Sequence, residues 1–275
     1  MNKKFFSEIH NVLTLEGDGV KSFLHGQTTS NLLAAQSGEI IHSCWLNTLG
    51  RVRAILEIHM HENKAKIICL AGQIEDIHNA FERMIFPADN VNISKGNQVN
   101  RYQIIDLDQS DLKKEIILME DFDAIPVDFT DVKKATSEEL QRFKLETGFP
   151  LGPGEINGKH NPFEIGLEFL VDMNKGCYLG QETIARLSRN SQQIKKLFFW
   201  QSENKVKCGD IYQLRPNKEN DWLRVGVITS CYEDVIKSGC LGLAIIKYST
   251  IEKNENFFVN KENKIILKEI LTKKI

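Results

Sequence analysis

The sequence predicts an α+β protein with an antiparallel β-barrel at its C-terminal end. Through most of the chain, short segments in which apolar and polar residues alternate, as in strands, are interrupted irregularly by a few segments with helical spacing. After residue 194 the strand-like segments follow one another regularly with turn residues between them, which is typical of a barrel or sandwich of about five or six strands. We therefore place an α+β region at residues 1–190 and a barrel domain at residues 194–275.

Composition limits the class of protein. The chain has 275 residues, of which 41% are hydrophobic and 26% are charged, values typical of a globular protein with room for more than one domain. Its net charge of −2 provides no broad basic surface, so we expect no direct contact with nucleic acid. The N-terminal segment lacks the apolar core of a signal peptide and no apolar run has the length of a membrane span, so we expect no membrane association.

The cysteines and histidines argue against two other kinds of site. None of the six cysteines forms a C-x-x-C pair, and a chain of this length needs no disulfide framework, so we expect a reducing compartment and a cytoplasmic protein. His59 and His61 lie near acidic residues on a predicted strand, but no compact set of three ligands appears, so we expect no metal site. No glycine-rich phosphate loop occurs, which argues against the common kinds of nucleotide-dependent chemistry.

Apolar periodicity places the elements of the N-terminal part. Helical spacing predicts one helix over residues 20–26 and a second over residues 73–86, which Pro87 ends. Residues 88–100 are polar and rich in asparagine, which predicts a loop. Alternating apolar residues predict strands over residues 11–16, 40–47, 51–61 and 64–70.

The following segment contains a helix with clear end signals, over residues 136–147. Thr136 or Ser137 can cap its first turn, and Gly148 followed by Pro150 is typical of a helix end. Before it we expect strands over residues 102–107, 115–119 and 125–129. After it we expect a loop over residues 152–162, a polar linker over residues 190–193, and strands over residues 195–200, 210–214, 223–230 and 241–248.

The stretch with the strongest chemical character is KGCYLGQETIAR, at residues 175–186. Its second part predicts a helix over residues 181–188, so Cys177 lies just before a helix start, where unpaired N–H groups and the helix dipole favour an anion. Lys175 adds positive charge nearby. Both effects favour thiolate over thiol, which makes Cys177 the candidate reactive cysteine. A small, inert cysteine in a tight turn is the alternative that these residues alone leave open.

The same stretch resembles the K-G-C-[YF]-x-G-Q-E signature of the YgfZ family, folate-binding proteins related to the aminomethyltransferase (T-protein) of the glycine cleavage system. The resemblance implies a ring of α+β subdomains, two of them within residues 1–190, around a central cavity that admits tetrahydrofolate or a related reduced folate. Further strings that resemble these proteins are spread along nearly the whole chain, at residues 26–31, 46–51, 142–150, 161–167, 226–230 and 239–244.

The resemblance also suggests which residues hold the folate. Glu146 matches the T-protein glutamate that contacts the pterin, whose N–H groups need a carboxylate partner. We expect Arg142, Asn47, Arg51 and Tyr178, which lie in the resembled strings, to contribute to the same site.

Four positions depart from the resembled proteins. Ala54 and Ile55 stand where the T-protein has a pair of aspartates, one of which is its catalytic acid. Neither side chain can carry a proton, so aminomethyl transfer by that route should be absent. Leu140 and His10 stand where some YgfZ proteins have aromatic residues, one of which stacks on folate, so folate affinity is open.

The resemblance implies a role in maintaining iron–sulfur enzymes, including tRNA-modifying ones. We expect Cys177 to lie on the rim of the folate cavity and to act as a thiolate, in redox exchange or as a transient sulfur or cluster contact, with Lys175, Gln181 and Glu182 ordering its loop. The expected partners are folate and iron–sulfur enzymes or cluster-assembly proteins, and we expect a monomer. A tetrahydrofolate-dependent aminomethyltransferase and a non-catalytic folate-binding scaffold are the alternatives, and the sequence leaves open whether any reaction is catalysed.

Overall fold

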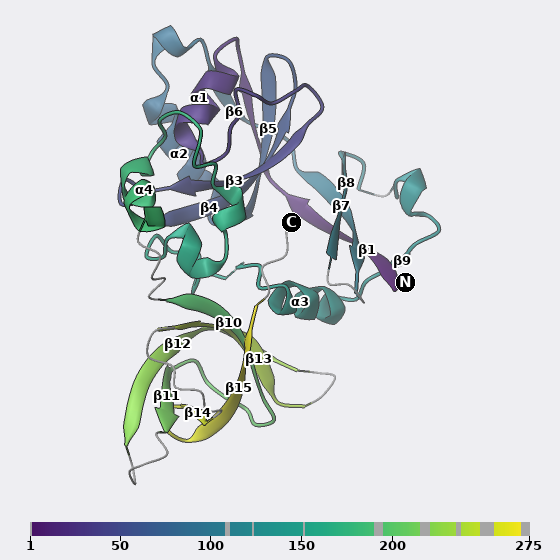
Figure 1. The fold of residues 1–275 in the computed structure, drawn as a ribbon. Helices are drawn as coiled ribbons and strands as arrows, with labels where there is room; N and C mark the ends of the chain where they lie inside the picture. Colours follow the sequence, from purple (N-terminus) through teal and green to yellow (C-terminus); the bar gives the residue numbers. More distant parts are fainter. Residues whose placement is uncertain are drawn as a thin grey trace.

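The computed structural model describes residues 2–107, 111–122, 124–150, 152–189, 195–214, 221–234, 238–247 and 256–270. Within these residues the strands form two open sheets and one closed barrel. The helix α3 (Ser137–Glu146) lies between the barrel and the open sheets (Figure 1). The predicted linker at residues 190–193 lies outside the described residues.

The N-terminal sheet is antiparallel, with strand order β3-β4-β5-β2-β6. The helices α1 (Val20–Gln27) and α2 (Ile74–Met84) pack on it through a shared core in which Phe81 lies edge-on to both Phe23 and Trp45. The inner strand β4 is buried along nearly its whole length, because its residues belong to apolar cores on both faces of the sheet. The strands are β2 (Val12–Glu16), β3 (Ile40–Leu46), β4 (Val52–Met60), β5 (Lys64–Ala71) and β6 (Asn92–Lys95).

The central sheet has strand order β8-β7-β1-β9. Its middle strands β1 and β7 are antiparallel, with Phe6 opposite Gln103 and Glu8 opposite Arg101. The helix α3 packs on this sheet through Phe143. Its start is capped by Thr136, one of the two predicted caps, and Glu139 returns a hydrogen bond to the Thr136 backbone. The strands are β1 (Lys3–His10), β7 (Val99–Asp106), β8 (Asp111–Met119) and β9 (Lys133–Lys134).

The C-terminal part of the chain forms the closed barrel, with strand order β10-β13-β12-β11-β14-β15. All its pairings are antiparallel, and Trp200 is fully buried in its core. The predicted barrel is therefore confirmed. The strands are β10 (Lys196–Ser202), β11 (Asp210–Leu214), β12 (Trp222–Glu233), β13 (Cys240–Ile246), β14 (Phe257–Val259) and β15 (Asn263–Glu269).

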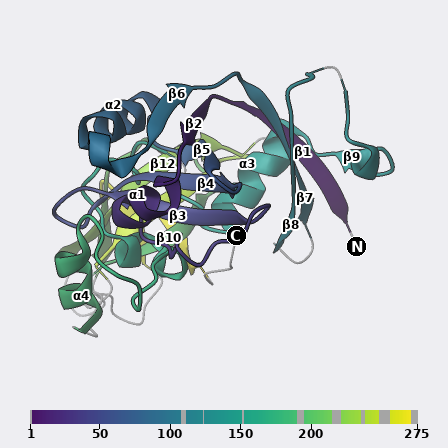
Figure 2. The same cartoon turned by 90° about the horizontal axis from the view of Figure 1, so that it is seen from above.

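A long connection between α3 and the barrel joins the parts. It contains η3 (Pro162–Ile165), η4 (Glu168–Leu170) and α4 (Gln181–Arg189). Ile165 and Ile184 from this connection share one apolar core with Ile55 of the N-terminal sheet and Leu243 of the barrel. Seen from above, α4 lies on the opposite side of the molecule from β1 (Figure 2). In the described part of the chain, no helix is long and apolar enough to span a membrane.

Three predictions of local structure were wrong or incomplete. Residues 88–100 are not a loop throughout, because β6 and the start of β7 lie there; β6 is a mostly exposed edge strand and shows no apolar alternation. Residues 125–129 do not form a strand but contain the 3₁₀ turn η2 (Val127–Phe129), which follows Pro126. The strand β1 was not predicted, and a further 3₁₀ turn, η1 (Pro87–Asp89), follows α2.

Candidate functional site

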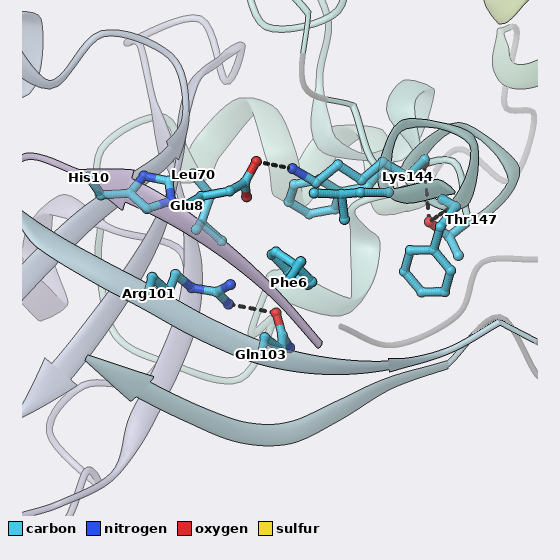
Figure 3. Close-up of a pocket in the computed structure, with 11 residues that line it drawn as sticks. Phe6, Glu8, His10, Leu70, Arg101, Gln103, Lys144 and Thr147 are labelled. Atoms are coloured by element: carbon cyan, nitrogen blue, oxygen red, sulfur yellow. Dashed lines mark hydrogen bonds and ion pairs between the residues drawn. The ribbon is translucent and has the colours of Figure 1, made fainter. Parts of the chain in front are cut away.

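A cavity of about 230 Å³ lies between β1, β5, β7 and α3 (Figure 3). Its wall combines apolar and polar side chains. The apolar part is formed by Phe6, Leu70, Leu140, Phe143 and Phe149, and the polar part by Glu8, His10, Arg101, Gln103, Lys144 and Thr147.

Strand register and helix periodicity bring these residues together. Facing residues of antiparallel strands project to the same side of a sheet, so the Phe6–Gln103 and Glu8–Arg101 pairs share one face. On α3 and the turn after it, Leu140, Phe143, Lys144 and Thr147 recur at the spacing of one helix face and point toward the sheet. The cavity therefore lies where a polar stripe of the central sheet meets a mixed face of α3.

Two cations lie over one aromatic ring at the cavity. The guanidinium carbon of Arg101 is 5.9 Å from the centre of the Phe6 ring, and Lys144 Nζ is 5.6 Å from it. Lys144 Nζ also donates to Glu8 Oε1 at 2.6 Å, across the gap between α3 and β1 (Figure 3). The charge of Lys144 is thus balanced by Glu8 within the site. The charged partner of Arg101 does not line the cavity and belongs to the N-terminal sheet.

That partner is Glu57 of β4, whose carboxylate is fully buried. Arg101 Nε lies 3.0 and 2.9 Å from its two oxygens, and Arg101 Nη2 lies 2.6 Å from Oε2. His42 Nε2 and His59 Nε2 lie 3.0 and 2.8 Å from the same carboxylate. Burial by itself would raise the pKa of Glu57, but the hydrogen bonds from His42 and His59 and the charge of Arg101 hold it well below its usual range.

A second cavity, of about 430 Å³, adjoins the first and extends toward the barrel. Both are lined by Glu8, Leu140, Lys144 and Phe149. At its far end lies Glu155, a fully buried residue whose Oε2 accepts a hydrogen bond from the N–H of Gly152 at 3.0 Å, and burial raises the pKa of this carboxyl. In the described residues, no group of three or more His, Cys, Asp or Glu side chains is arranged to hold a metal ion.

The predicted cysteine loop lies elsewhere, against the end of α1. Lys175 is buried, and its Nζ donates to the backbone carbonyls of His25, Thr28 and Ser30 at 2.5, 2.6 and 2.9 Å. Burial lowers the pKa of Lys175 to about 8. Lys175 thus orders the loop, but through carbonyl oxygens; no hydrogen bond between Lys175 and Cys177 is found in the described structure.

The other predicted residues of this loop have distinct surroundings. Cys177 is exposed and precedes α4, which begins at Gln181. Gln181 Nε2 donates to the Lys175 carbonyl at 3.4 Å, whereas Glu182 is exposed in the first turn of α4. Tyr178 is buried, and Lys175 Nζ lies 4.8 Å from the centre of the Tyr178 ring. Burial raises the pKa of the Tyr178 hydroxyl to about 12.

Asn47 and Arg51 hold a neighbouring turn in shape. Asn47 Oδ1 accepts from the N–H groups of Leu49 and Arg51, both at 3.0 Å, and Arg51 Nη1 donates to Glu164 Oε2 at 3.2 Å. This turn packs directly on the cysteine loop, because a Cβ placed on Gly180 would lie 2.7 Å from the Asn47 carbonyl oxygen. The structure therefore brings Asn47, Arg51 and the cysteine loop together, in a position where none of them lines either cavity described above.

Arg142 and Glu146 form a separate pair on α3. Arg142 Nε donates to Glu146 Oε1 at 2.9 Å, and Arg142 Nη1 donates to Asp234 Oδ2 at 3.1 Å, which ties α3 to the barrel. These side chains do not line the two cavities, whereas Leu140 on the same helix lines both. Glu146 is paired with Arg142 and lies on another face of α3 than Leu140, and its predicted contact with a ligand stays a prediction.

The predicted single site, with Cys177 at the rim of the folate cavity, is thus separated into two places in the structure. Cys177 lines neither cavity, since its loop is anchored on α1 by Lys175. Sequence reasoning missed the polar residues of the cavity itself, Arg101, Glu8 and Lys144. The signal that could have found Arg101 is its alternation with Gln103 in a strand whose other residues are largely apolar.

The comparisons with known proteins agree with this fold. No family model matches the chain. It is 20% identical over 263 residues to an uncharacterised protein from Haemophilus influenzae, a match that covers 90% of each chain. It is 34% identical over 96 residues to the tRNA-modifying protein YgfZ from Buchnera aphidicola, which covers 34% of this chain and 30% of that protein. Its fold is similar to the crystal structure of aminomethyltransferase T of the glycine cleavage system from Bartonella henselae, with a TM-score of 0.70, 14% identity, and coverage of 97% of this chain and 84% of the other. The resemblance to the YgfZ proteins and the predicted α+β fold class with a C-terminal barrel are confirmed.

Proposed function

We propose that this YgfZ-like chain binds tetrahydrofolate or a related reduced folate in the cavity between β1, β7 and α3, and that it supports the assembly or repair of iron–sulfur enzymes, including tRNA-modifying ones. The observation that carries the proposal is the make-up of that cavity. Phe6, Phe143 and Phe149 offer aromatic surface, and Arg101 and Lys144 bring two positive charges to it. Such a wall suits a flat heterocycle with a polar edge, which is the chemistry of a pterin ring.

The adjoining cavity supports the same ligand class. A folate has a pterin connected to an aromatic ring and an acidic tail, so it needs an elongated space rather than a compact one. The second cavity continues from the first past Lys144 toward Ser230 and Tyr232 of the barrel. In this arrangement the pterin occupies the inner cavity, and the remainder of the folate extends along the outer one.

Aminomethyl transfer is the less favoured function of the same cavity. Ala54 and Ile55 are both completely buried apolar residues of β4. The strand thus offers no carboxyl group where the T-protein route needs one. Turnover of the glycine-cleavage carrier protein by the purified chain with tetrahydrofolate would contradict this assignment.

Titration calorimetry with tetrahydrofolate tests the binding proposal. Leu140→Trp adds bulk to a residue that lines both cavities, and we expect it to weaken binding by about 1–3 kcal/mol, or about 5- to 150-fold. Leu33→Trp is the matched control, because Leu33 is exposed and lines neither cavity. No heat of binding with the unmodified chain would remove folate from the proposal.

The role of the cysteine is tested in cells. Cys177→Ala is expected to lower the activity of iron–sulfur enzymes and the level of tRNA modifications that depend on them, because an exposed thiol is available to a client protein. Cys208→Ala is the matched control, since Cys208 is also exposed but lies in the barrel part of the chain. If both variants behave like the unmodified chain while folate still binds, the protein is a folate-binding scaffold without a thiol function.

A further inference from the structure

Arg101 presents an unused pair of hydrogen-bond donors at the cavity. Its Nε and Nη2 are bonded to Glu57, and Nη2 also donates to Gln103 Oε1 at 2.8 Å. Its Nη1 makes no hydrogen bond to any residue that the structure describes, although the side chain is only 3% exposed. A guanidinium carries five N–H donors, so the two on Nη1 require acceptors that the described protein does not supply.

The position of Arg101 is fixed before any ligand arrives. Its two bonded nitrogens lie against a buried carboxylate that His42 and His59 hold from the other side. The one acidic residue that lines the cavity beside it, Glu8, is paired with Lys144 at 2.6 Å. Arg101 is therefore a preorganised donor, and reorienting it would break a buried ion pair.

His10 provides a second unsatisfied group at the same end of the cavity. Its Nε2 is buried and has no hydrogen-bond partner among the described residues. Burial lowers the pKa of His10, which favours the neutral ring, and a neutral imidazole has one nitrogen that accepts a hydrogen bond. His10 and Arg101 lie on paired neighbouring strands and line the same cavity (Figure 3).

We infer that this end of the cavity recognises the lactam edge of a 4-oxo pterin, with the ring carbonyl oxygen accepting from Arg101 Nη1 and the adjacent ring N–H donating to His10 Nε2. The inference rests on the proposed function and adds the part of the ligand that determines specificity. A 4-amino pteridine has the opposite pattern, because it places an amino donor where the carbonyl oxygen was and an unprotonated ring nitrogen where the N–H was. The amino group of the 4-amino pteridine would face the N–H donors of Arg101, so neither group would find an acceptor. A site that hydrogen-bonds one pattern of donors and acceptors binds an analogue with the opposite pattern more weakly.

Calorimetry with tetrahydrofolate and its 4-amino analogue tetrahydroaminopterin tests the inference, because the two ligands differ only at this edge. We expect the unmodified chain to bind the 4-oxo ligand at least about tenfold more tightly. The double variant Glu57→Gln/Arg101→Gln leaves no unpaired charge in the core, and in it the ratio of the two dissociation constants should fall toward one. Arg101→Lys, which keeps the charge beside Glu57 but lacks Nη1, should also reduce the ratio. Circular dichroism checks that each variant is folded.

The outcomes separate this inference from the proposed function. Equal affinity of the unmodified chain for the two ligands overturns the inference and leaves the folate site in place. A preference that survives in both Arg101 variants, with the fold intact, also overturns it, since the discrimination would then come from other residues. Binding of neither ligand contradicts the proposed function and, with it, the inference.

Discussion

Arg101 of β7 and Glu57 of β4 join the central sheet to the N-terminal sheet through a buried ion pair, in which Arg101 Nη2 lies 2.6 Å from Glu57 Oε2. Neither side chain has appreciable contact with solvent: the exposed fractions are 3% and 0%. The cavity on one side of Arg101 and the two histidines beyond Glu57 are thus connected through one pair of charges.

Removing one partner of this ion pair should destabilise the protein strongly. Arg101→Ala leaves the Glu57 carboxylate buried without its counter-ion, and such a change costs about 3–5 kcal/mol. Lys64→Ala is the control, because the Lys64–Glu16 pair has a similar distance of 2.6 Å but is exposed, and we expect a loss below about 1 kcal/mol. Urea unfolding measures both values. Similar losses for the two variants would show that the buried pair does not hold the sheets together.

The same carboxylate predicts a loss of stability in acid. The pKa of Glu57 is well below its usual value of 4.5 because hydrogen bonds and the Arg101 charge outweigh the effect of burial. A carboxyl whose pKa is lower in the folded state than in the unfolded state stabilises the folded protein fully at a pH above its unfolded-state pKa. This stabilisation is lost as the pH falls toward the folded-state pKa. The free energy of unfolding should therefore decrease below about pH 4.5. In Glu57→Gln/Arg101→Gln this part of the acid dependence should be missing; an unchanged dependence would exclude Glu57 as its source.

Local signals explain which parts of the structure could be predicted from the sequence. The start of α3 depends on Thr136 and Glu139, which are three residues apart and cap each other, so their sequence spacing is sufficient. The barrel was predicted from four of its six strands, which follow one another at regular spacing with turn residues between them, whereas β14 and β15 were not predicted. The edge strand β6 was missed, since pairing with β2 rather than its own apolar pattern makes it a strand.

The candidate site could not be predicted in the same way. Arg101 and Glu57 are 44 residues apart, and their contact depends on how two sheets pack. Lys144 and Glu8 are 136 residues apart. The resemblance to YgfZ proteins found the cysteine loop, which is a contiguous string, and it named Glu146 for the folate, whereas the residues that line the cavity came from the structure alone. Long-range pairs of this kind have no signature in a single sequence.

The six cysteines should differ sharply in their reactivity. Cys177 and Cys208 are exposed, whereas burial raises the pKa of Cys44 and of Cys69 to about 12. Burial, together with the neighbouring thiols, also raises the pKa of Cys231 to about 12. Because the thiolate is the reacting species, iodoacetamide at mildly alkaline pH should modify Cys177 and Cys208 first. Peptide mass spectrometry over time measures the order, and the urea-unfolded chain is the control in which the differences should vanish. Modification of Cys44 as fast as Cys177 would contradict the described packing.

The packing of the cysteine loop on the Asn47 turn should depend on the absence of a side chain at Gly180. This residue has a φ of +82°, and an added Cβ would lie 2.7 Å from the Asn47 carbonyl oxygen. Gly38 has a similar φ of +88° with nothing within 4 Å of the added atom, so Gly38→Ala measures the backbone cost alone, about 1–2 kcal/mol. Gly180→Ala should add about 1–3 kcal/mol for the steric clash.

Urea unfolding separates these two costs, and iodoacetamide labelling gives an independent readout at the site. If the clash displaces the loop, the rate at which iodoacetamide modifies Cys177 should change in Gly180→Ala, because Cys177 lies in the displaced segment. In Gly38→Ala the rate should equal that of the chain without a substitution, because Gly38 does not contact this segment. Equal losses of stability in the two variants, with an unchanged rate for Cys177, would mean that the loop does not need its close contact with the Asn47 turn. A larger loss in Gly180→Ala together with a changed rate would establish that this contact determines how the thiol is presented.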